Sequence, residues 1–231
     1  MKKGIEKTIK ILIDYYPKTA PMARAQQNNP FRTLIATLMS ARTRDSVTID
    51  IAYKLFEVAD TPTDILKLEV DKLSQMIKGV NFYKTKAKAI INLCQKLIED
   101  FEGQVPITEK ELVTLPGVGA KTARVFLNEA LNQNVIAVDV HVNRVPNRLG
   151  YIKTKTPEQT QQVLEKIVPE NIKGNTNRAF VYHGQNICLP KKPKCEVCPV
   201  FEFCDFGINK LGKDFKPKIT PKPTLQVGDY S

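Results

Sequence analysis

The sequence predicts an all-α protein. Apolar residues recur three and four positions apart along most of the chain, which is the spacing that gives a helix one apolar face. Two of these segments open with Thr-Pro, a pattern typical of a helix start. The one run with the character of a β-strand is "VIAV" at residues 135–138, and we expect it to be an extended connection.

The N-terminal stretch "MKKGIEKTIKILIDYYP" is expected to form the first helix, because Ile5, Ile9 and Leu12 fall on one face. Lys10 and Asp14 interrupt its apolar residues, so the stretch has neither a signal-peptide core nor a membrane span. We therefore expect a cytoplasmic protein that does not bind membranes. Cysteines in that compartment serve more often as metal ligands or thiols than in disulfides.

Two helices are expected next. The first covers residues 31–39 after Pro30, which suits the first turn of a helix. The second covers residues 46–58, and either Asp45 or Ser46 can cap its N-terminus.

Further helix starts follow along the chain. In "TPTDIL", Thr61 can cap the helix and Pro62 occupies the first turn, where its missing N–H costs nothing. A long amphipathic helix is expected at residues 85–101, and "TPEQ" from Thr156 has the capping-box pattern. Residues 211–231 are rich in Lys and Pro and lack a helical period, so we expect a flexible basic extension.

Composition indicates the kind of partner. The 231 residues include 35 Lys and Arg against 24 Asp and Glu, a net charge of +11. This excess suits a polyanion such as DNA, because basic side chains that neutralise phosphates release condensed counterions. The same charge would also keep a protein soluble without such a partner. With 42% hydrophobic residues, the chain can bury one large core or two small ones.

The stretch "LPGVGAKT" at residues 115–122 lacks the spacing of a nucleotide-binding P-loop, which requires Gly, four residues and Gly-Lys-Ser/Thr. Short helices are expected on both sides of it, and "LSQMIKGVNFYKTKAKAI" repeats the pattern weakly. A tight turn between helices directs backbone N–H groups outward at a helix N-terminus, where they can bind a phosphate oxygen. Unless the segment is an ordinary helical corner, the residues predicted to bind the phosphate of a nucleic acid are Leu115, Gly117, Val118, Gly119 and Thr122.

Four of the five cysteines lie together in "CLPKKPKCEVCPVFEFC", with six, two and five residues between them. Such a group is typical of a metal site, and its chemistry allows tetrahedral zinc or a [4Fe–4S] cluster. Only one pair has the Cys-x-x-Cys spacing that a zinc ribbon usually has twice, whereas Cys94 is expected in the core. The predicted ligands are Cys188, Cys195, Cys198 and Cys204. The lysines between the first two ligands, which we expect to bind phosphate, are Lys191, Lys192 and Lys194.

Together these residues resemble the endonuclease III family, the DNA glycosylase/AP lyases of base excision repair. The resemblance extends from about Phe31 to Cys204. It rests on "FRTLIATLMSARTRD", "LPGVGAKTA", "VDVHVNR", "HG" at residues 183–184, and the complete cysteine spacing.

The resemblance implies an all-α fold of two lobes. A six-helix barrel would cover residues 25–132 and would contain the helix-hairpin-helix motif at residues 109–131. Both chain ends, residues 1–24 and 133–210, would form a lobe that holds a [4Fe–4S] cluster, followed by the extension at residues 211–231. Damaged double-stranded DNA would lie across the cleft between the lobes, bound by a monomer.

The resemblance assigns the chemistry to Lys121 and Asp139. An amine that attacks C1′ displaces the base and forms a Schiff base, from which the 3′ phosphate leaves by β-elimination. A free lysine, with a pKa near 10.4, is almost fully charged at pH 7, but a helix N-terminus and loss of water under bound DNA favour the neutral amine. The carboxylate of Asp139 would stabilise the developing positive charge or accept a proton, or it could only cap the helix that follows. A resting ion pair would favour the ammonium, so we expect none.

A nucleotide that is extruded from the duplex leaves a gap that a side chain must fill. The resemblance assigns this role to the turn at residues 41–45, where the family has a glutamine and this chain has Arg42. We expect Arg42 to enter the duplex or to bind a phosphate. His141 and His183 are expected to be hydrogen-bonded structural residues without a catalytic role.

Three functions remain open at this point. The first is a bifunctional glycosylase/lyase that acts on oxidised pyrimidines. The second is a mismatch or adenine DNA glycosylase of the same fold, and Lys121 argues against it because monofunctional relatives generally lack an amine there. The third is a non-catalytic iron–sulfur protein that binds DNA or transfers electrons, which the presence of both Lys121 and Asp139 disfavours.

Overall fold

The computed structural model describes residues 4–16 and 29–219. Every regular element among them is helical, as predicted. Residues 132–139, which include "VIAV", connect two helices in an irregular conformation. None of the described helices combines the length and the apolar character that a membrane crossing requires.

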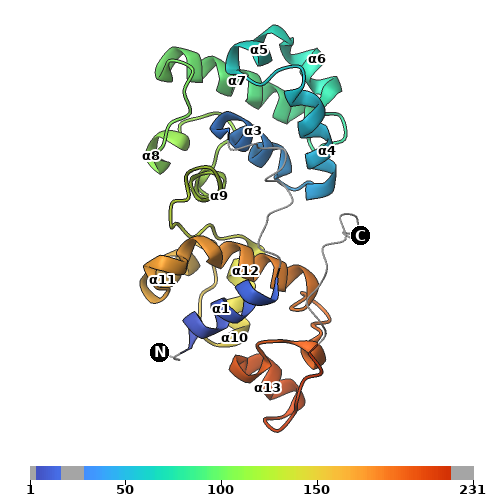
Figure 1. The fold of residues 1–231 in the computed structure, drawn as a ribbon, viewed down its shortest axis with the longest axis vertical. Coiled ribbons are helices and arrows are strands. Elements are labelled where there is room, and N and C mark those ends of the chain that lie inside the picture. Colours follow the sequence, from blue (N-terminus) through green and yellow to red (C-terminus); the bar gives the residue numbers. More distant parts are fainter. Residues whose placement is uncertain (1–3, 17–28, 220–231) are drawn as a thin grey trace. The chain divides into compact units, whose positions relative to one another are not determined.

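The chain divides into two compact units (Figure 1). Among the described residues, the first unit combines residues 4–16 with residues 134–219, so it draws on segments that are far apart in the sequence. The second unit consists, among the described residues, of residues 29–133.

The described helices of the second unit are arranged around a buried central helix. Their bounds are α3 (Pro30–Ser40), α4 (Asp45–Phe56), α5 (Pro62–Lys67), α6 (Glu69–Met76), α7 (Tyr83–Phe101), α8 (Glu109–Leu112) and α9 (Ala120–Leu131). Every side chain of residues 33–39 is buried, so α3 lacks a solvent-facing side over these turns, and it packs against α4, α7 and α9. Cys94 of α7 is fully buried in this unit, as expected for a core thiol.

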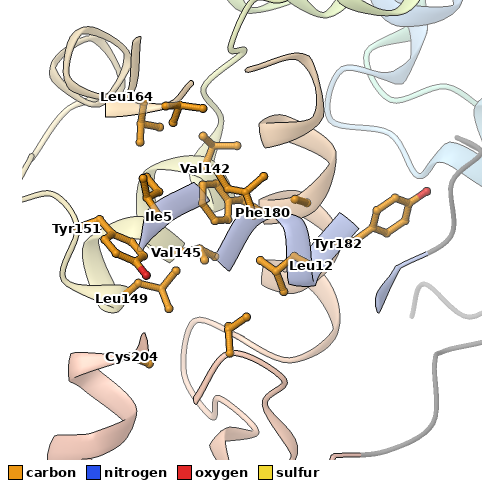
Figure 2. Packing of buried hydrophobic residues seen from close by; sticks show 14 of the residues in the cluster. Ile5, Leu12, Val142, Val145, Leu149, Tyr151, Leu164, Phe180, Tyr182 and Cys204 are labelled. Carbon is orange, nitrogen blue, oxygen red and sulfur yellow. The ribbon is translucent and has the colours of Figure 1, made fainter. Parts of the chain in front are cut away.

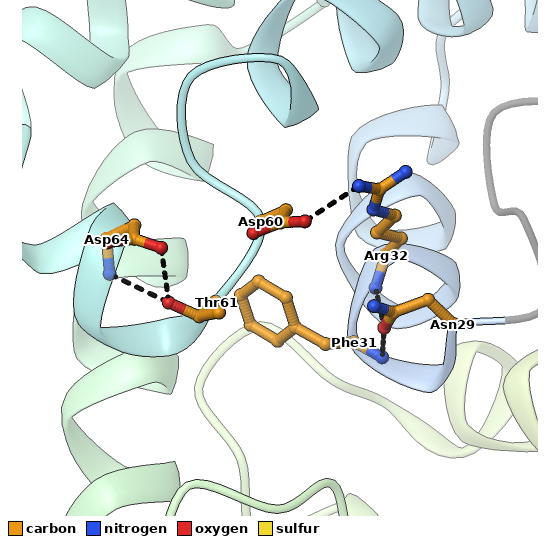
Figure 3. A network of polar contacts seen from close by, with 6 residues as sticks. All are labelled: Asn29, Phe31, Arg32, Asp60, Thr61 and Asp64. Carbon is orange, nitrogen blue, oxygen red and sulfur yellow. Dashed lines mark hydrogen bonds and ion pairs between the residues drawn. The ribbon is translucent and has the colours of Figure 1, made fainter.

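Side-chain caps and an ion pair fix the starts of α3 and α5 (Figure 3). Asn29 Oδ1 accepts a hydrogen bond from Arg32 N at 3.2 Å. The Arg32 guanidinium in turn lies 2.7 Å from Asp60 Oδ2, and thereby connects α3 to the segment before α5. Thr61 Oγ1 accepts from Asp64 N at 3.2 Å, which confirms the predicted cap.

Helix α4 differs from the prediction at its start. It begins at Asp45, and the N-cap position belongs to Arg44, whose side chain makes no capping hydrogen bond. Arg44 takes this position because it is the last extended residue after the turn at residues 41–43. The predicted cap at Asp45 or Ser46 is therefore wrong.

The first unit is built on the contact of the N-terminal helix with a later helix, residues 173–186, around a shared buried cluster. Its elements are α1 (Ile5–Tyr15), α10 (Val140–Leu149), α11 (Pro157–Ile167), η1 (Glu170–Ile172), α12 (Lys173–Asn186), η2 (Cys195–Val197), η3 (Phe201–Phe203) and α13 (Asp205–Leu211). Ile5 and Leu12 of α1 pack among Val142, Val145 and Phe180 in the buried cluster of Figure 2. Each buried side chain of this size contributes about 1.5–3 kcal/mol relative to its exposed state. The apolar face read from the sequence thus anchors α1.

The predicted capping box and the predicted extension have different outcomes. Thr156 Oγ1 accepts from Gln159 N at 3.3 Å, as predicted.

In the predicted flexible extension, however, residues 212–219 pack on the first unit. The ring of Phe215 lies 5.4 Å from that of Phe201, and Lys218 N donates to Glu196 O at 2.8 Å. The remainder of that extension, residues 220–231, lies outside the described residues.

Candidate nucleic-acid interface and iron–sulfur site

The turn between α8 and α9 has a backbone form that its sequence requires. Val118 N donates to Leu115 O at 3.1 Å, Pro116 follows Leu115, and Gly117 has a φ of 80°. This is a type II β-turn, which favours Pro at its second position and Gly at its third. The side chains of Leu115 and Val118 are buried and hold the turn against the core. These two residues, which we predicted to bind DNA, can therefore offer only backbone atoms.

The N-terminus of α9 faces outward without a side-chain cap. Its first internal backbone bond runs from Ala123 N to Gly119 O at 2.9 Å, so the amides that precede Ala123 in the first turn lack a helix-internal acceptor. A Cβ added to Gly119 would meet no atom within 4 Å, which leaves the approach to these amides open. Lys121 lies in this turn with an exposed side chain, and Thr122 is half-buried. The arrangement suits a phosphate oxygen.

A second exposed turn carries Arg42. Its φ is 58°, and its carbonyl oxygen accepts a hydrogen bond from Asn81 Nδ2. The Arg42 guanidinium lies 6.0 Å from the ring centroid of Phe82, which is 61% exposed and also has a positive φ, 59°. Sequence reasoning missed Asn81 and Phe82, although both lie in the stretch that repeats the hairpin pattern weakly.

Asp139 forms the N-cap of α10. Its Oδ1 accepts from His141 N at 2.8 Å and from Val142 N at 2.9 Å, which fixes the carboxylate at the helix N-terminus. The side chain is half-buried. Lys121 belongs to the second unit and Asp139 to the first.

Both histidines are held by hydrogen bonds, as predicted. His141 Nδ1 lies 3.0 Å from Arg144 Nη2, and His183 lies between Tyr16 Oη at 3.2 Å and Cys198 Sγ at 3.7 Å. Burial, together with the positive charge of Arg144, lowers the pKa of His183 to about 3. His183 is therefore neutral at pH 7 and serves to connect α1 to the cysteine segment.

The four predicted ligands line one cavity in the first unit. Other residues that line it include Val145, Arg148 and His183. The cysteines that line it are Cys188, Cys195, Cys198 and Cys204. Burial raises the pKa of Cys198 to about 12, because a thiolate is poorly solvated there. Bound iron would supply the positive charge that this thiolate requires.

The four cysteines around one cavity can be compared with the ligand sets of a zinc ion and of a [4Fe–4S] cluster. Four thiolates that share one tetrahedral zinc, with Zn–S near 2.3 Å, stand about 3.8 Å apart. Among the described residues, no three His, Cys, Asp or Glu side chains are placed to share one ion. A [4Fe–4S] cluster has no such requirement, because each cysteine binds a different iron. The set of four cysteines around one cavity therefore fits the cluster.

Two arginines of α10 hold the segment between the first two ligands. Arg148 donates to Leu189 O and to Pro190 O, both at 2.6 Å. Arg144 donates to Cys188 O at 3.1 Å and to Gly184 O at 3.0 Å. The basic side chains that this segment exposes are Lys191, Lys192 and Lys194. Sequence reasoning missed both arginines as supports, because their partners lie some 40 positions away.

Hydrogen bonds from the protein also reach the sulfurs. Gly207 N donates to Cys204 Sγ at 3.3 Å, and Arg148 Nη1 lies 3.5 Å from Cys188 Sγ. Donors of this kind stabilise the thiolate form that binds iron.

Comparisons with protein families give two matches along the chain. Residues 35–170 match the family described as HhH-GPD superfamily base excision DNA repair protein. Residues 188–204 match the iron–sulfur binding domain of endonuclease III. Endonuclease III of Thermotoga maritima is 39% identical over 87% of this chain and 92% of its own length. Endonuclease III of Escherichia coli K12 is 38% identical over 80% of this chain and 88% of its own length.

Solved structures agree with these matches. A non-covalent endonuclease III–DNA complex has a TM-score of 0.83 at 32% identity, covering 91% of this chain and 98% of the other. A trapped endonuclease III–DNA covalent intermediate has a TM-score of 0.78 at 33% identity, covering 88% and 93%. A thermostable thymine-DNA glycosylase has a TM-score of 0.79 at 25% identity, covering 90% and 100%. The chain therefore belongs to the endonuclease III family of base excision repair DNA glycosylases and AP lyases, with four cysteines that hold a [4Fe–4S] cluster.

Proposed function

We propose that this enzyme removes oxidised pyrimidines from double-stranded DNA, with Lys121 as the nucleophile and Asp139 as the carboxylate that assists base release. The observation that carries the proposal is the position of Lys121. Its exposed side chain lies in the first turn of α9, the same turn whose amides can receive a DNA phosphate. A phosphate bound there would bring the sugar of that nucleotide near the amine.

The proposed reaction has two parts. First, the neutral Nζ of Lys121 attacks C1′, and the base leaves with the electron pair of the glycosidic bond and gains a proton. The C1′–O4′ bond then breaks, a proton passes from Nζ to O4′, and C1′ and Nζ form an imine. The negative charge of Asp139 stabilises the cation-like sugar as the base leaves. Second, C2′ loses a proton, the 3′ phosphate leaves, and water hydrolyses the imine to release Lys121. A covalent intermediate of this kind is consistent with the trapped endonuclease III–DNA complex.

The remaining predicted contacts would hold the DNA. The hairpin amides near Gly117 and Gly119, together with Thr122, would bind one stretch of backbone. The exposed lysines of the loop after Cys188 would bind another, and Arg42 would occupy the gap left by the extruded nucleotide. The cluster would hold that lysine loop in shape without taking part in the chemistry. Because phosphate contacts read no base edges, they would locate the duplex without specifying a sequence.

A panel of duplexes tests the substrate class. Each duplex carries one thymine glycol, dihydrouracil, uracil, mismatched thymine or abasic site, and borohydride is added to trap imines. We expect base release and trapping with the first two lesions, and trapping without base release at the abasic site. The Lys121→Gln variant should bind the same duplexes but neither trap nor nick them. If Lys121→Gln still traps, another amine is the nucleophile.

The thymine-DNA glycosylase of similar fold supports a second candidate, a mismatch glycosylase. In that case mismatched thymine or uracil would be the preferred substrate of the panel. Lys121 favours the first candidate, since a glycosylase that uses only water needs no amine at this position.

A further inference from the structure

A buried lysine closes the C-terminus of α3. Lys86, on the first turns of α7, is only 9% exposed. Its Nζ lies 2.7 Å from Met39 O, 2.6 Å from Ala41 O and 3.3 Å from Thr43 Oγ1. An ammonium has three N–H donors, so all three of them have acceptors here.

These acceptors explain why an ammonium is placed in the interior. The last carbonyls of a helix lack intrahelical donors and carry the negative end of the helix dipole, which a cation satisfies. Burial lowers the pKa of Lys86 to about 8. Hydrogen bonds to acceptors and a nearby helix C-terminus stabilise the charged form of a lysine. A neutral, apolar side chain at this position would leave Met39 O buried without a donor.

The turn that Lys86 holds is the one that carries Arg42. A non-glycine residue in the left-handed region, such as Arg42 with its φ of 58°, keeps that conformation only where its surroundings impose it. Lys86 holds the residue on one side of Arg42 through Ala41 O, and the residue on the other side through Thr43 Oγ1. Asn81 also holds this turn. Its backbone N–H donates to Thr43 Oγ1 at 3.1 Å, and its side-chain amide donates to Arg42 O.

We propose that Lys86 is a positioning residue for the entry of Arg42 into the duplex. This proposal rests on the function proposed above. The side chain of Arg42 is long and has many rotamers, so a fixed backbone is what makes its entry into a one-nucleotide gap reproducible. A displacement of such an element by about 1 Å can reduce a rate by up to roughly a hundredfold.

The test compares two variants that lose the same charge from the same helix. Lys86→Met removes the buried ammonium, and Lys88→Met removes an exposed one two residues later. Where Lys86→Met does not fold, Lys86→Gln replaces it, since a shorter polar side chain also loses the reach to Ala41 O. Circular dichroism confirms that each variant is folded at the assay temperature.

The first readout needs no chemistry. In a Lys121→Gln background, 2-aminopurine is placed opposite a tetrahydrofuran abasic analogue, and its fluorescence rises when a side chain disturbs its stacking. We expect Lys86→Met to lose most of this rise at saturating protein, as Arg42→Ala does, and Lys88→Met to retain it. A full rise with Lys86→Met would overturn the proposal, whether or not the enzyme releases oxidised pyrimidines.

The second readout distinguishes a loss of Arg42 positioning from a general loss of enzyme activity. Lys86→Met should reduce base release from a paired duplex between about tenfold and a hundredfold. It should leave imine trapping on an abasic site in single-stranded DNA within about twofold, because no gap has to be filled there. In an Arg42→Ala background the effect of Lys86→Met should largely disappear. Equal losses on both substrates, or an undiminished loss without Arg42, would overturn the proposal. A wild-type enzyme that releases no base from any duplex would instead contradict the proposed function.

Discussion

Asp139 combines a structural task with the catalytic one proposed for it. Its Oδ1 accepts two backbone N–H groups at the start of α10. Replacement by alanine would therefore remove a cap and a charge together, and a loss of activity could not be assigned to either. Asparagine keeps a side-chain oxygen for the cap, so the two tasks can be separated.

We expect Asp139→Asn to fold with unchanged stability and to release the base about a hundredfold more slowly, an electrostatic effect of roughly 3 kcal/mol. Asp139→Ala should also lose about 1 kcal/mol of stability with the cap. Nicking of a preformed abasic site should suffer less in both variants, because no cation-like sugar forms there. Single-turnover kinetics and thermal unfolding measure these effects. A stability loss in Asp139→Asn equal to that of Asp139→Ala would contradict the separation.

Contacts of single residues also mark the limit of sequence reasoning. The caps at Thr61, Thr156 and Asp139 could be predicted, because each bonds to an amide two or three positions away. Lys86 could not, because its acceptors lie more than 40 positions away and a lysine on an amphipathic helix normally faces water. Arg148 was missed for the same reason.

At the scale of elements, the two glycines between α8 and α9 have different roles. Gly117 has a φ of 80°, and a Cβ there would lie 3.1 Å from Ala89 Cβ and 3.2 Å from Leu38 Cδ1. Gly119 has an ordinary φ of −92° and open space around it. The first glycine therefore serves the fold, and the second leaves room for a ligand.

Replacing each glycine by alanine should therefore affect a different property, stability in one case and DNA affinity in the other. Gly117→Ala should lose about 1–2 kcal/mol of stability from the left-handed backbone alone, and more from the close contacts. Gly119→Ala should keep its stability but bind DNA more weakly, because its Cβ would stand where a phosphate approaches. Chemical denaturation and binding to an abasic-analogue duplex measure the two effects. Unchanged DNA affinity in Gly119→Ala would show that the phosphate lies elsewhere.

The lysine loop after Cys188 offers a test of the second predicted contact. Its backbone is fixed by the two α10 arginines, whereas its three lysines are exposed. If each lysine meets one phosphate, their joint replacement by alanine should reduce the slope of log affinity against log salt by about two to three units. Joint replacement of Lys72, Lys84 and Lys88, exposed lysines of α6 and α7, provides a control of equal charge. Equal slopes for the two triple variants would mean that the loop does not meet DNA.

At the scale of the whole molecule, metal binding at the cysteine cavity has the stabilising role that a larger apolar core would otherwise have. Cys195, Cys198 and Cys204 belong to the same buried cluster as α1, α10 and α12. The segment around them contains only short 3₁₀ helices and the seven-residue α13. Metal coordination is the usual means by which so little regular structure remains folded.

Purified protein should contain about four irons per chain. Cys198→Ser should lose iron and unfold the segment from Cys188 to Cys204, so that DNA affinity falls through loss of the lysine loop. Cys94→Ala, which alters a buried thiol of the other unit, should keep its full iron content. Metal analysis and visible absorption follow both variants. A colourless protein with stoichiometric zinc would contradict the cluster.

The two units also differ in when they can be completed during synthesis. The described part of the second unit, residues 29–133, is continuous, so it can fold as soon as it leaves the ribosome. Helix α1 must wait for α12, and at about 5–20 residues per second the chain from Tyr15 to Asn186 takes on the order of ten seconds or more. Throughout that interval its apolar face has no partner within its own unit. We therefore expect α1 to be the segment of the nascent chain that chaperones bind, and iron to be inserted only after translation has passed Cys204.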